Sequence, residues 1–262
     1  IYRFLDNYNK DNWVLNIIPA QNKISRKLEF KPIDISNNAN DLLFRHGKHI
    51  IMMSATVLNK DAYCESLGID KNDVEFLSID SPFPIENRPV FYAPVGKMSA
   101  REIDNTLPHM GKMVKELLKH HKNEKGIIHT NSYKIAYYLK NNIRSNRLLI
   151  HNSENRDKIL EKHLTSKKPT VLISPSMTEG VDLYDVLSRF QIVCKTPFPY
   201  LGDPVVRKRM KKWNWWYPYM TAKTIIQSIG RSIRNKDDHC ITYVIDQNFE
   251  YFYDKNENIF PP

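Results

Sequence analysis

The sequence predicts an α/β fold in which helices flank a doubly wound, mainly parallel β-sheet. Short apolar runs alternate with longer stretches of helical periodicity, which is the pattern of parallel strands joined by crossover helices. The runs are continuously apolar rather than alternating, as in strands that are covered on both faces. We expect strands at residues 50–53, 126–129, 148–150, 170–173, 190–194 and 241–245.

The stretches between these runs predict the helices and one domain boundary. Helices are expected where apolar residues recur three to four positions apart, at residues 61–67, 133–142 and 156–164. The amino-acid composition changes over residues 76–99, where prolines stand at positions 82, 84, 89 and 94. Proline-rich, irregular stretches are typical of linkers, so the expected boundary lies here.

Length and composition exclude several classes of protein. The 262 residues suffice for one large domain or two small ones, and the 41% of hydrophobic residues suffice for a packed core. No stretch approaches about 18 consecutive apolar residues, so no membrane-spanning helix is expected. Three widely separated cysteines form neither a zinc pattern nor a disulfide framework, which favours a reducing, intracellular compartment. The chain begins with Ile1 and shows no leader peptide, so we expect a fragment of a longer protein.

The charge balance favours a polyanionic partner. There are 39 Lys+Arg against 29 Asp+Glu, a formal net charge of +10, and nucleic acid is the first candidate. The densest basic run, 207–212 (RKRMKK), is followed directly by the aromatic stretch 213–219 (WNWWYPY). Two interpretations stay open for this stretch. Its tryptophans could stack bases beside a basic groove, but a core role with solvated lysines is favoured.

Residues 227–234 (QSIGRSIR) carry the clearest chemical signal. A helix expected over 222–234 places three isoleucines on one stripe and holds Gln227, Arg231 and Arg234 together beside it. Two guanidiniums bind phosphate oxygens through planar forks and keep their charge. Gly230 weakens a helix by about 1 kcal/mol relative to Ala, which is understandable if a ligand approaches the backbone there. The alternative is a surface helix with solvated arginines.

This pattern resembles motif VI of the superfamily 2 helicases. Three further segments resemble motifs of that family and occur in the family's order. Residues 54–56 (SAT) resemble motif III, residues 126–132 (GIIHTNS) resemble motif IV and residues 177–183 (MTEGVDL) resemble motif V. The segment 197–204 (PFPYLGDP) is similar to the connector of the XPD/DinG branch. The resemblance runs from about residue 13 to residue 249 and implies a RecA-like, P-loop NTPase-type motor domain.

The resemblance also implies how the chain is divided. No GxxxxGK[ST] sequence and no DEAH-like acidic motif occurs in the 262 residues, and in the family both lie upstream, in the first motor domain. Residues 1–84 are therefore expected to be the C-terminal remnant of that domain, and 85–262 a complete second motor domain. ATP with Mg²⁺ would be bound mainly by the missing upstream domain, and the fragment would be inactive alone.

Site residues follow from the resemblance position by position. Arg231 and Arg234 would act on the nucleotide phosphates as arginine fingers, and no residue is assigned to a metal. Nucleotide binding is expected of Gln227, Gly230, Glu179, Gly180 and Asp182, where Asp182 would meet the ribose or orient the arginines. Ser54 and Thr56 would couple the two domains. Nucleic-acid contacts are expected of Thr130, Asn131, Ser132, Ser174 and Thr178. For each motif the alternative is an ordinary helix cap or strand-end turn.

The resulting hypothesis is the C-terminal part of an ATP-dependent helicase or translocase that moves on single-stranded or fork DNA. It would work inside the cell, in the cytoplasm or nucleoid, and the Asn-, Lys- and Ile-rich composition hints at an AT-rich bacterial or phage genome. One alternative is a catalytically inactive nucleic-acid-binding module with a degenerate helicase fold. Another is a remodeller that moves on duplex without unwinding it. The sequence upstream of Ile1 discriminates the motor from the inactive module.

Overall fold

The computed structural model describes residues 8–19, 26–152, 154–175 and 182–261, and it divides the chain into two compact units. One unit comprises Ile1–Ser78 and Phe198–Met220, with Pro261, and is called the hairpin unit below. The other comprises Ile79–Pro197 and Thr221–Phe260, with Pro262, and is called the sheet unit. The chain therefore passes from the sheet unit to the hairpin unit and back between the expected motifs V and VI.

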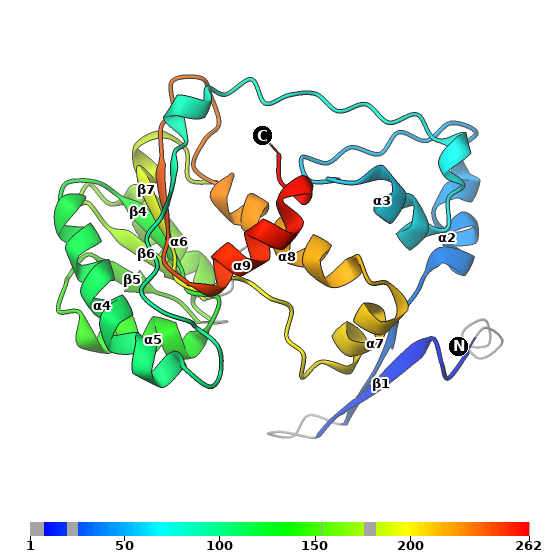
Figure 1. The fold of residues 1–262 in the computed structure, drawn as a ribbon, viewed down its shortest axis with the longest axis horizontal. Coiled ribbons are helices and arrows are strands. Elements are labelled where there is room, and N and C mark those ends of the chain that lie inside the picture. Colours follow the sequence, from blue (N-terminus) through cyan, green and yellow to red (C-terminus); the bar gives the residue numbers. More distant parts are fainter. Residues whose placement is uncertain (1–7, 20–25, 153, 176–181, 262) are drawn as a thin grey trace. The chain divides into compact units, whose positions relative to one another are not determined.

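A six-stranded parallel sheet, in the order β3-β8-β7-β4-β6-β5, forms the centre of the sheet unit (Figure 1). Its strands are β3 (Val90–Tyr92), β4 (Gly126–His129), β5 (Leu148–Ile150), β6 (Val171–Ser174), β7 (Phe190–Val193) and β8 (Ile241–Val244). The predicted fold class is confirmed. Five of the six predicted strands are present within a residue or so of their expected ends.

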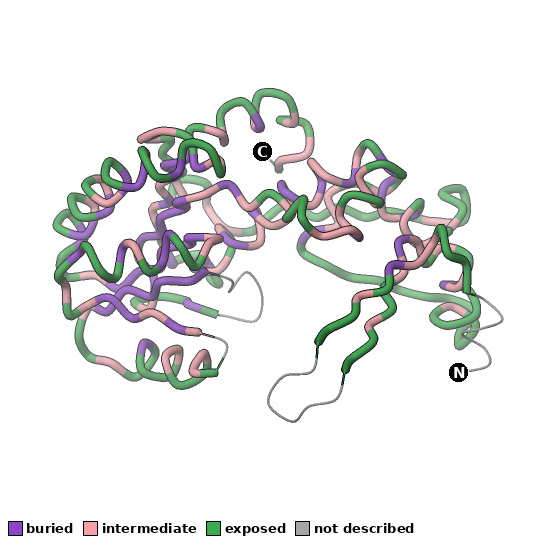
Figure 2. The backbone as a smooth tube through the Cα atoms, turned by 90° about the horizontal axis from the view of Figure 1, so that it is seen from below, coloured by how far each residue is buried: buried purple, intermediate pink, exposed green. Residues whose placement is uncertain are grey.

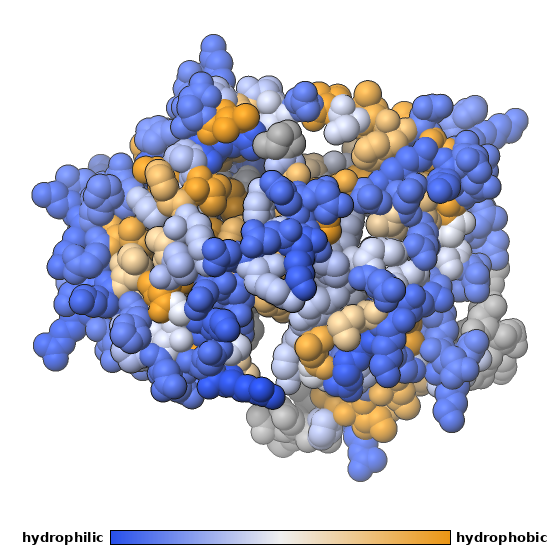
Figure 3. All heavy atoms as spheres, in the orientation of Figure 1, coloured by the Kyte–Doolittle hydropathy of each residue, from blue (hydrophilic) through white to orange (hydrophobic). Residues whose placement is uncertain are grey.

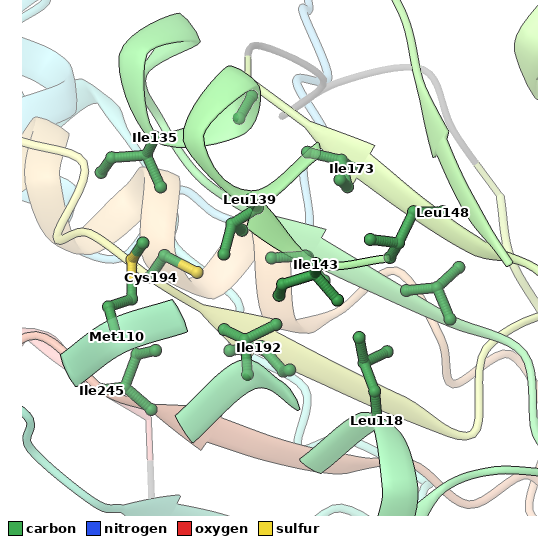
Figure 4. Packing of buried hydrophobic residues seen from close by; sticks show 14 of the residues in the cluster. Met110, Leu118, Ile135, Leu139, Ile143, Leu148, Ile173, Ile192, Cys194 and Ile245 are labelled. Atoms are coloured by element: carbon green, nitrogen blue, oxygen red, sulfur yellow. The ribbon is translucent and has the colours of Figure 1, made fainter. Parts of the chain in front are cut away.

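One face of this sheet is covered by α4 (Ile103–His120) and α5 (Tyr133–Asn142). The helix α4 forms because its buried apolar residues recur three to four positions apart and so share one stripe. Figure 4 shows Met110 of α4 and Leu139 of α5 packed together with Ile173 and Ile192 of the sheet. The strands are mostly buried, whereas the outer sides of the helices are exposed (Figure 2).

The opposite face carries α6 (Arg156–Thr165), whose Ile159 and Leu160 pack on Ile127 and Leu172. Because successive side chains of a strand point to opposite faces, Ile127 and Ile128 belong to different cores. By the same alternation, His129 and Gln191 share the face of Ile127, the residue that pairs with Gln191. Two polar side chains are thus buried on the α6 face of the two central strands.

The helix expected over 222–234 is corrected by the structure. The helix α8 (Trp216–Ile229) ends five residues earlier. The helix α9 (Asn248–Asn256) follows β8 and packs on the second half of α8. The amide of Gly230 makes the last helical bond, to Ile226 O at 2.9 Å. Glycine is disfavoured inside helices and common just past their ends. Only Gln227 of the three expected side chains therefore lies on the helix.

The hairpin unit is built around two antiparallel strands, β1 (Trp13–Ile18) and β2 (Lys27–Pro32). Its helices are α2 (Ser36–Leu42), α3 (Lys60–Leu67) and α7 (Pro204–Lys212). Val14, Ile33 and Val205 form a small core. Apolar side chains also gather on the surface over β1 (orange, Figure 3). Short 3₁₀ turns complete both units, at Phe44–His46, Lys71–Asp73, Ile85–Asn87, Asp185–Leu187 and Glu257–Ile259.

Two sequence interpretations are settled in the hairpin unit. The strand expected at 50–53 is wrong: this run is irregular, and Ile51 and Met53 are 87% and 90% exposed. A strand needs a hydrogen-bonded neighbour, and none pairs with this run in the described part of the chain. The core role of the tryptophans is confirmed for Trp213 and Trp216, which are buried. Within the described residues, no helix combines the length and apolarity that crossing a membrane requires.

Candidate nucleotide and nucleic-acid site

Two segments of the sheet unit that lie far apart in sequence are bound together at the candidate nucleotide site. One follows β6 and contains the end of the expected motif V; the other follows α8 and contains most of the expected motif VI. The amide of Leu183 donates to the carbonyl oxygen of Arg231 at 3.2 Å, and the buried hydroxyls of Ser188 and Ser232 are 2.8 Å apart. Leu183 is fully buried in the α6-side core, which anchors the first segment.

Arg234 and Asp182 form an ion pair between these two segments. The Nε of Arg234 donates to a carboxylate oxygen of Asp182, and its Nη1 donates to the carbonyl oxygen of Gly230 at 2.8 Å. The Arg234 side chain is 39% exposed and that of Asp182 is 59% exposed. The guanidinium is therefore held in place and also open to solvent. An oriented, accessible guanidinium is suited to binding a phosphate.

A buried carboxylate, Asp238, organises the backbone after α8. One of its oxygens accepts hydrogen bonds from the amides of Arg234 (2.8 Å) and Asn235 (3.1 Å), and the other accepts one from the amide of Asp185 (3.1 Å). Asp238 is 2% exposed. These bonds hold the backbone of Arg234 and Asn235 in a turn. The sequence interpretation missed Asp238, although Asn and Asp residues that cap nearby amides are a known turn signal.

Two further residues that the sequence interpretation missed connect the central strands with the end of α8. The side-chain nitrogen of Gln191 donates to the carbonyl oxygen of Ile229 at 2.7 Å, and its side-chain oxygen lies 3.3 Å from Nε2 of His129. Burial lowers the pKa of His129 to about 4, opposed by the hydrogen bond to Gln191 and aided by the positive charge of Arg231. His129 is therefore neutral and donates from Nε2. Buried polar side chains in strands carry no distinctive spacing in the sequence.

The candidate nucleic-acid residues meet at the carboxyl ends of β4 and β6. Thr130 is fully buried, and its hydroxyl lies 3.1 Å from the carbonyl oxygen of Ser132 and 3.3 Å from that of Ser174. Thr130 and the buried Ser174 are therefore part of the interior. Asn131 has a positive φ of 48°, and its side-chain nitrogen donates to the carbonyl oxygen of Lys195 at 2.7 Å. This bond connects the loop after β4 to the loop after β7.

Ser132 stands at the N-terminus of α5 and its side chain makes no capping bond there. The side chains of Asn131 and Ser132 are half-buried. Parallel strands that end at one edge, followed by a helix N-terminus, offer backbone amides to an anion. Of the four described residues expected to contact nucleic acid, Asn131 and Ser132 are thus the two that a strand can reach.

The remaining expected residues are placed as follows. Ser54 and Thr56 lie in the hairpin unit, where the amide of Thr56 donates to the hydroxyl of Ser54 at 3.2 Å and Thr56 is buried. Gln227 is half-buried on α8, and Gly230 is exposed. Thr178, Glu179 and Gly180 lie outside the described residues. Across the ranges that the structure describes, no group of His, Cys, Asp and Glu side chains could hold a metal ion.

Comparison with known proteins agrees with this geometry. The family model described as "Helicase C-terminal domain" matches residues 114–258. The chain is 28% identical over 238 residues to the ATP-dependent DNA helicase DinG of Photobacterium profundum, covering 80% of this chain and 33% of that protein. It is 28% identical over 120 residues to the ATP-dependent DNA helicase CHL1 of Candida albicans, covering 36% of this chain and 14% of that protein.

Solved structures share the fold. A structure titled apo XPD superposes with a TM-score of 0.69 at 21% identity, covering 90% of this chain and 51% of that chain. A structure titled XPD helicase superposes with a TM-score of 0.62 at 19% identity, covering 90% of this chain and 45% of that chain. The sheet unit therefore has the RecA-like fold. The chain spans about a third of the length of DinG and about half of the XPD chains.

Proposed function

Because the chain belongs to the helicase C-terminal domain family, as the C-terminal half of a superfamily 2 helicase of the XPD/DinG type, we propose that it couples ATP hydrolysis to movement along single-stranded DNA. The observation that carries this proposal is the Arg234–Asp182 ion pair, which fixes a cation at an exposed edge of a RecA-like sheet. With DNA as its substrate, the protein would work inside the cell, in the cytoplasm or nucleoid.

In this proposal Arg234 and Arg231 act on the phosphates of ATP. Asp182 and the carbonyl oxygen of Gly230 occupy the Nε and Nη1 groups of Arg234, and Nη2 has no protein partner among the described residues. That group can bind a phosphate oxygen without any rearrangement of the arginine. Arginine fingers that stabilise the charge of a transferring phosphoryl group contribute about 10³–10⁵ in rate. Asp182 is then an orienting residue rather than a ribose ligand.

The single strand would bind at Asn131, Ser132 and the N-terminus of α5. These groups follow His129 directly, and His129 is joined through Gln191 to Ile229, just before Gly230 and the arginines. A shift of the loop after β4 would therefore also shift the end of α8. This buried chain of hydrogen bonds supports a coupling of strand movement with the nucleotide site.

The proposal requires a first motor domain to supply the ATP phosphate cradle and the Mg²⁺ ligands. The chain's own arginines fit the nucleotide phosphates, but its described residues offer no cluster of metal ligands. Residues 1–84 would complete that first domain. The exposed apolar side chains of Ile51, Met53, Leu77 and Ile79 support this division, since each is more than four-fifths exposed, as strand residues without their sheet would be.

The second candidate function is the inactive nucleic-acid-binding module. The experiment that decides between the two candidates compares the full-length gene product with the isolated chain. The motor proposal predicts that full-length protein hydrolyses ATP in the presence of single-stranded DNA, while the isolated chain shows no turnover. Full-length protein that binds DNA without DNA-stimulated hydrolysis would establish the inactive module instead.

A further inference from the structure

The loop that connects the two units carries an exposed aromatic ring. Tyr200 is 79% exposed, and its ring lies directly against Gly202. A Cβ atom at Gly202 would collide with the ring, so the contact exists because this residue is glycine. Exposed tyrosines are usually free to rotate, whereas this ring rests on the backbone of its own loop.

The loop itself is held by several hydrogen bonds within the hairpin unit. The amide of Asp203 donates to the carbonyl oxygen of Tyr200 at 3.0 Å. The hydroxyl of Tyr217 donates to the carbonyl oxygen of Pro199 at 3.2 Å, and the Tyr217 ring stacks on Phe198 with an interplanar angle of 7°. Phe198 and Tyr217 therefore support the loop from the side of the hairpin unit, and Tyr200 projects from a fixed base.

The helix that follows this loop, α7, is strongly basic. It contains five cations and no acidic residue. Arg209 and Lys212 are used inside the unit: Arg209 donates to the carbonyl oxygens of Pro32 and Ile33, and Lys212 pairs with Asp34.

The other three cations, Arg207, Lys208 and Lys211, are exposed. Arg207 reaches the tyrosine loop, because its Nη1 donates to the carbonyl oxygens of Leu201 (2.8 Å) and Gly202 (3.1 Å). Lys211 lies one helical turn further along the same face, about 6 Å away along the axis.

We propose that Tyr200 is a stacking platform for a base of single-stranded nucleic acid, whose phosphates run along Arg207 and Lys211 of α7. This inference rests on the proposed function and adds a second strand-binding element to it, in the other unit of the chain. An ordered aromatic face beside a line of cations is the combination that binds single strands without sequence preference. Of the tryptophans that follow α7, Trp213 and Trp216 are buried and Trp215 donates from Nε1 to Glu65, whereas the ring of Tyr200 is exposed.

Charge complementarity favours nucleic acid over an apolar protein partner as the occupant. A protein surface would gain from the ring of Tyr200 but would have to desolvate Arg207, Lys208 and Lys211 without matching acids. A phosphate backbone pairs with these cations and releases counterions as it does so.

The test measures the affinity of full-length protein for a fluorescein-labelled oligo-dT strand by fluorescence anisotropy. Tyr200→Ala is expected to weaken binding about tenfold, within the range measured for base–aromatic stacking, and Tyr200→Trp to retain it. Gly202→Ala is expected to weaken binding as well, because its Cβ displaces the ring while the tyrosine is still present. The matched control is Tyr251→Ala, since Tyr251 is 66% exposed on α9 of the other unit and should not matter.

The salt dependence of binding provides a second, independent readout. The affinity should fall less steeply with salt in Lys211→Gln, which removes one phosphate contact. The slope of log affinity against log salt should become less negative by about 0.7. Unchanged affinity in Tyr200→Ala and Gly202→Ala, or an unchanged slope in Lys211→Gln, would overturn the platform while the helicase proposal stands. Failure of wild-type protein to bind any oligonucleotide would instead overturn the proposed function.

Discussion

The side-chain amide of Gln191 donates a hydrogen bond to the carbonyl oxygen of Ile229 at 2.7 Å. The donor lies in the middle of the sheet and the acceptor is the last residue of α8, one residue before Gly230. An unpaired carbonyl at a buried helix end is costly, so this bond fixes where α8 stops. The position of the backbone that carries Arg231 thus depends on a side chain of a central strand.

Gln191→Leu should therefore lower both stability and ATP turnover. The substitution leaves Ile229 O and His129 Nε2 without their partner, which costs about 1–3 kcal/mol of unfolding free energy. The measurement is urea unfolding of the chain, together with ATP hydrolysis of the full-length protein. The control is Ile192→Val, on the opposite face of the same strand, which costs about 0.5–1.5 kcal/mol through a cavity. Equal loss of turnover in both variants would contradict a positioning role for Gln191.

The stability of the chain should fall as pH is lowered from about 6.5 towards 4. Burial lowers the pKa of His129 and of His163 from the ordinary value of 6.5 to about 4. Between these values the unfolded chain binds protons that the folded chain does not, so each histidine contributes a slope of about 1.4 kcal/mol per pH unit. Urea unfolding at pH 7, 6 and 5 measures this slope. His129→Phe should reduce the slope by the contribution of one histidine, about 1.4 kcal/mol per pH unit. A slope that His129→Phe leaves unchanged would contradict the buried neutral histidine.

Asp238→Ala should loosen the backbone between α8 and β8. Three backbone amides, those of Asp185, Arg234 and Asn235, lose their shared acceptor. The expected result is faster hydrogen exchange at these amides and a loss of about 2–3 kcal/mol in unfolding free energy. Asp237→Ala is the control, because Asp237 is exposed next to it. Exchange that stays slow in Asp238→Ala would show that other contacts hold this segment.

The proposed division of the chain between two motor domains predicts that one substitution has two different effects. Ile51→Asp should be neutral in the isolated chain, where Ile51 is 87% exposed. In the full-length protein it should cost at least about 2 kcal/mol, because the proposed first domain covers this side chain. Thermal unfolding of both proteins provides the comparison, with Val186→Asp, 60% exposed in the sheet unit, as control. Neutrality in both contexts would count against a covering sheet at residues 50–53.

The parts of the fold that could be predicted from sequence are those that local patterns determine. Strands β4 to β7 are mostly apolar because both of their faces are covered, and the expected helix at 133–142 coincides with α5. The run at 50–53 has the same pattern but no neighbour to pair with, and pattern alone cannot reveal a missing neighbour. The end of α8 depends on Gln191, which acts from 38 residues away, and the turn at Arg234 depends on Asp238.

The candidate site was predictable to a similar degree. Motif spacing led to Asp182 and Arg234, and the ion pair agrees with the expectation that Asp182 orients an arginine. Spacing could not distinguish Ser132, which a strand can reach, from Thr130, which the fold buries. The core role that was favoured for the tryptophans holds for Trp213 and Trp216, but spacing did not single out Tyr200, because the exposure of an aromatic ring is decided by tertiary packing. Tyr200 is 79% exposed, and its ring lies against Gly202, two residues away.

The measurement that tests the central claim most directly is the ATP turnover and single-strand binding of Arg234→Ala in the full-length protein. The account predicts that turnover falls about 10³-fold or more, while the affinity for an oligo-dT strand stays within about twofold of wild type. Arg144→Ala, which removes an exposed arginine elsewhere in the sheet unit, should change neither. Wild-type turnover in Arg234→Ala, or an equal loss of turnover and strand binding, would contradict the account.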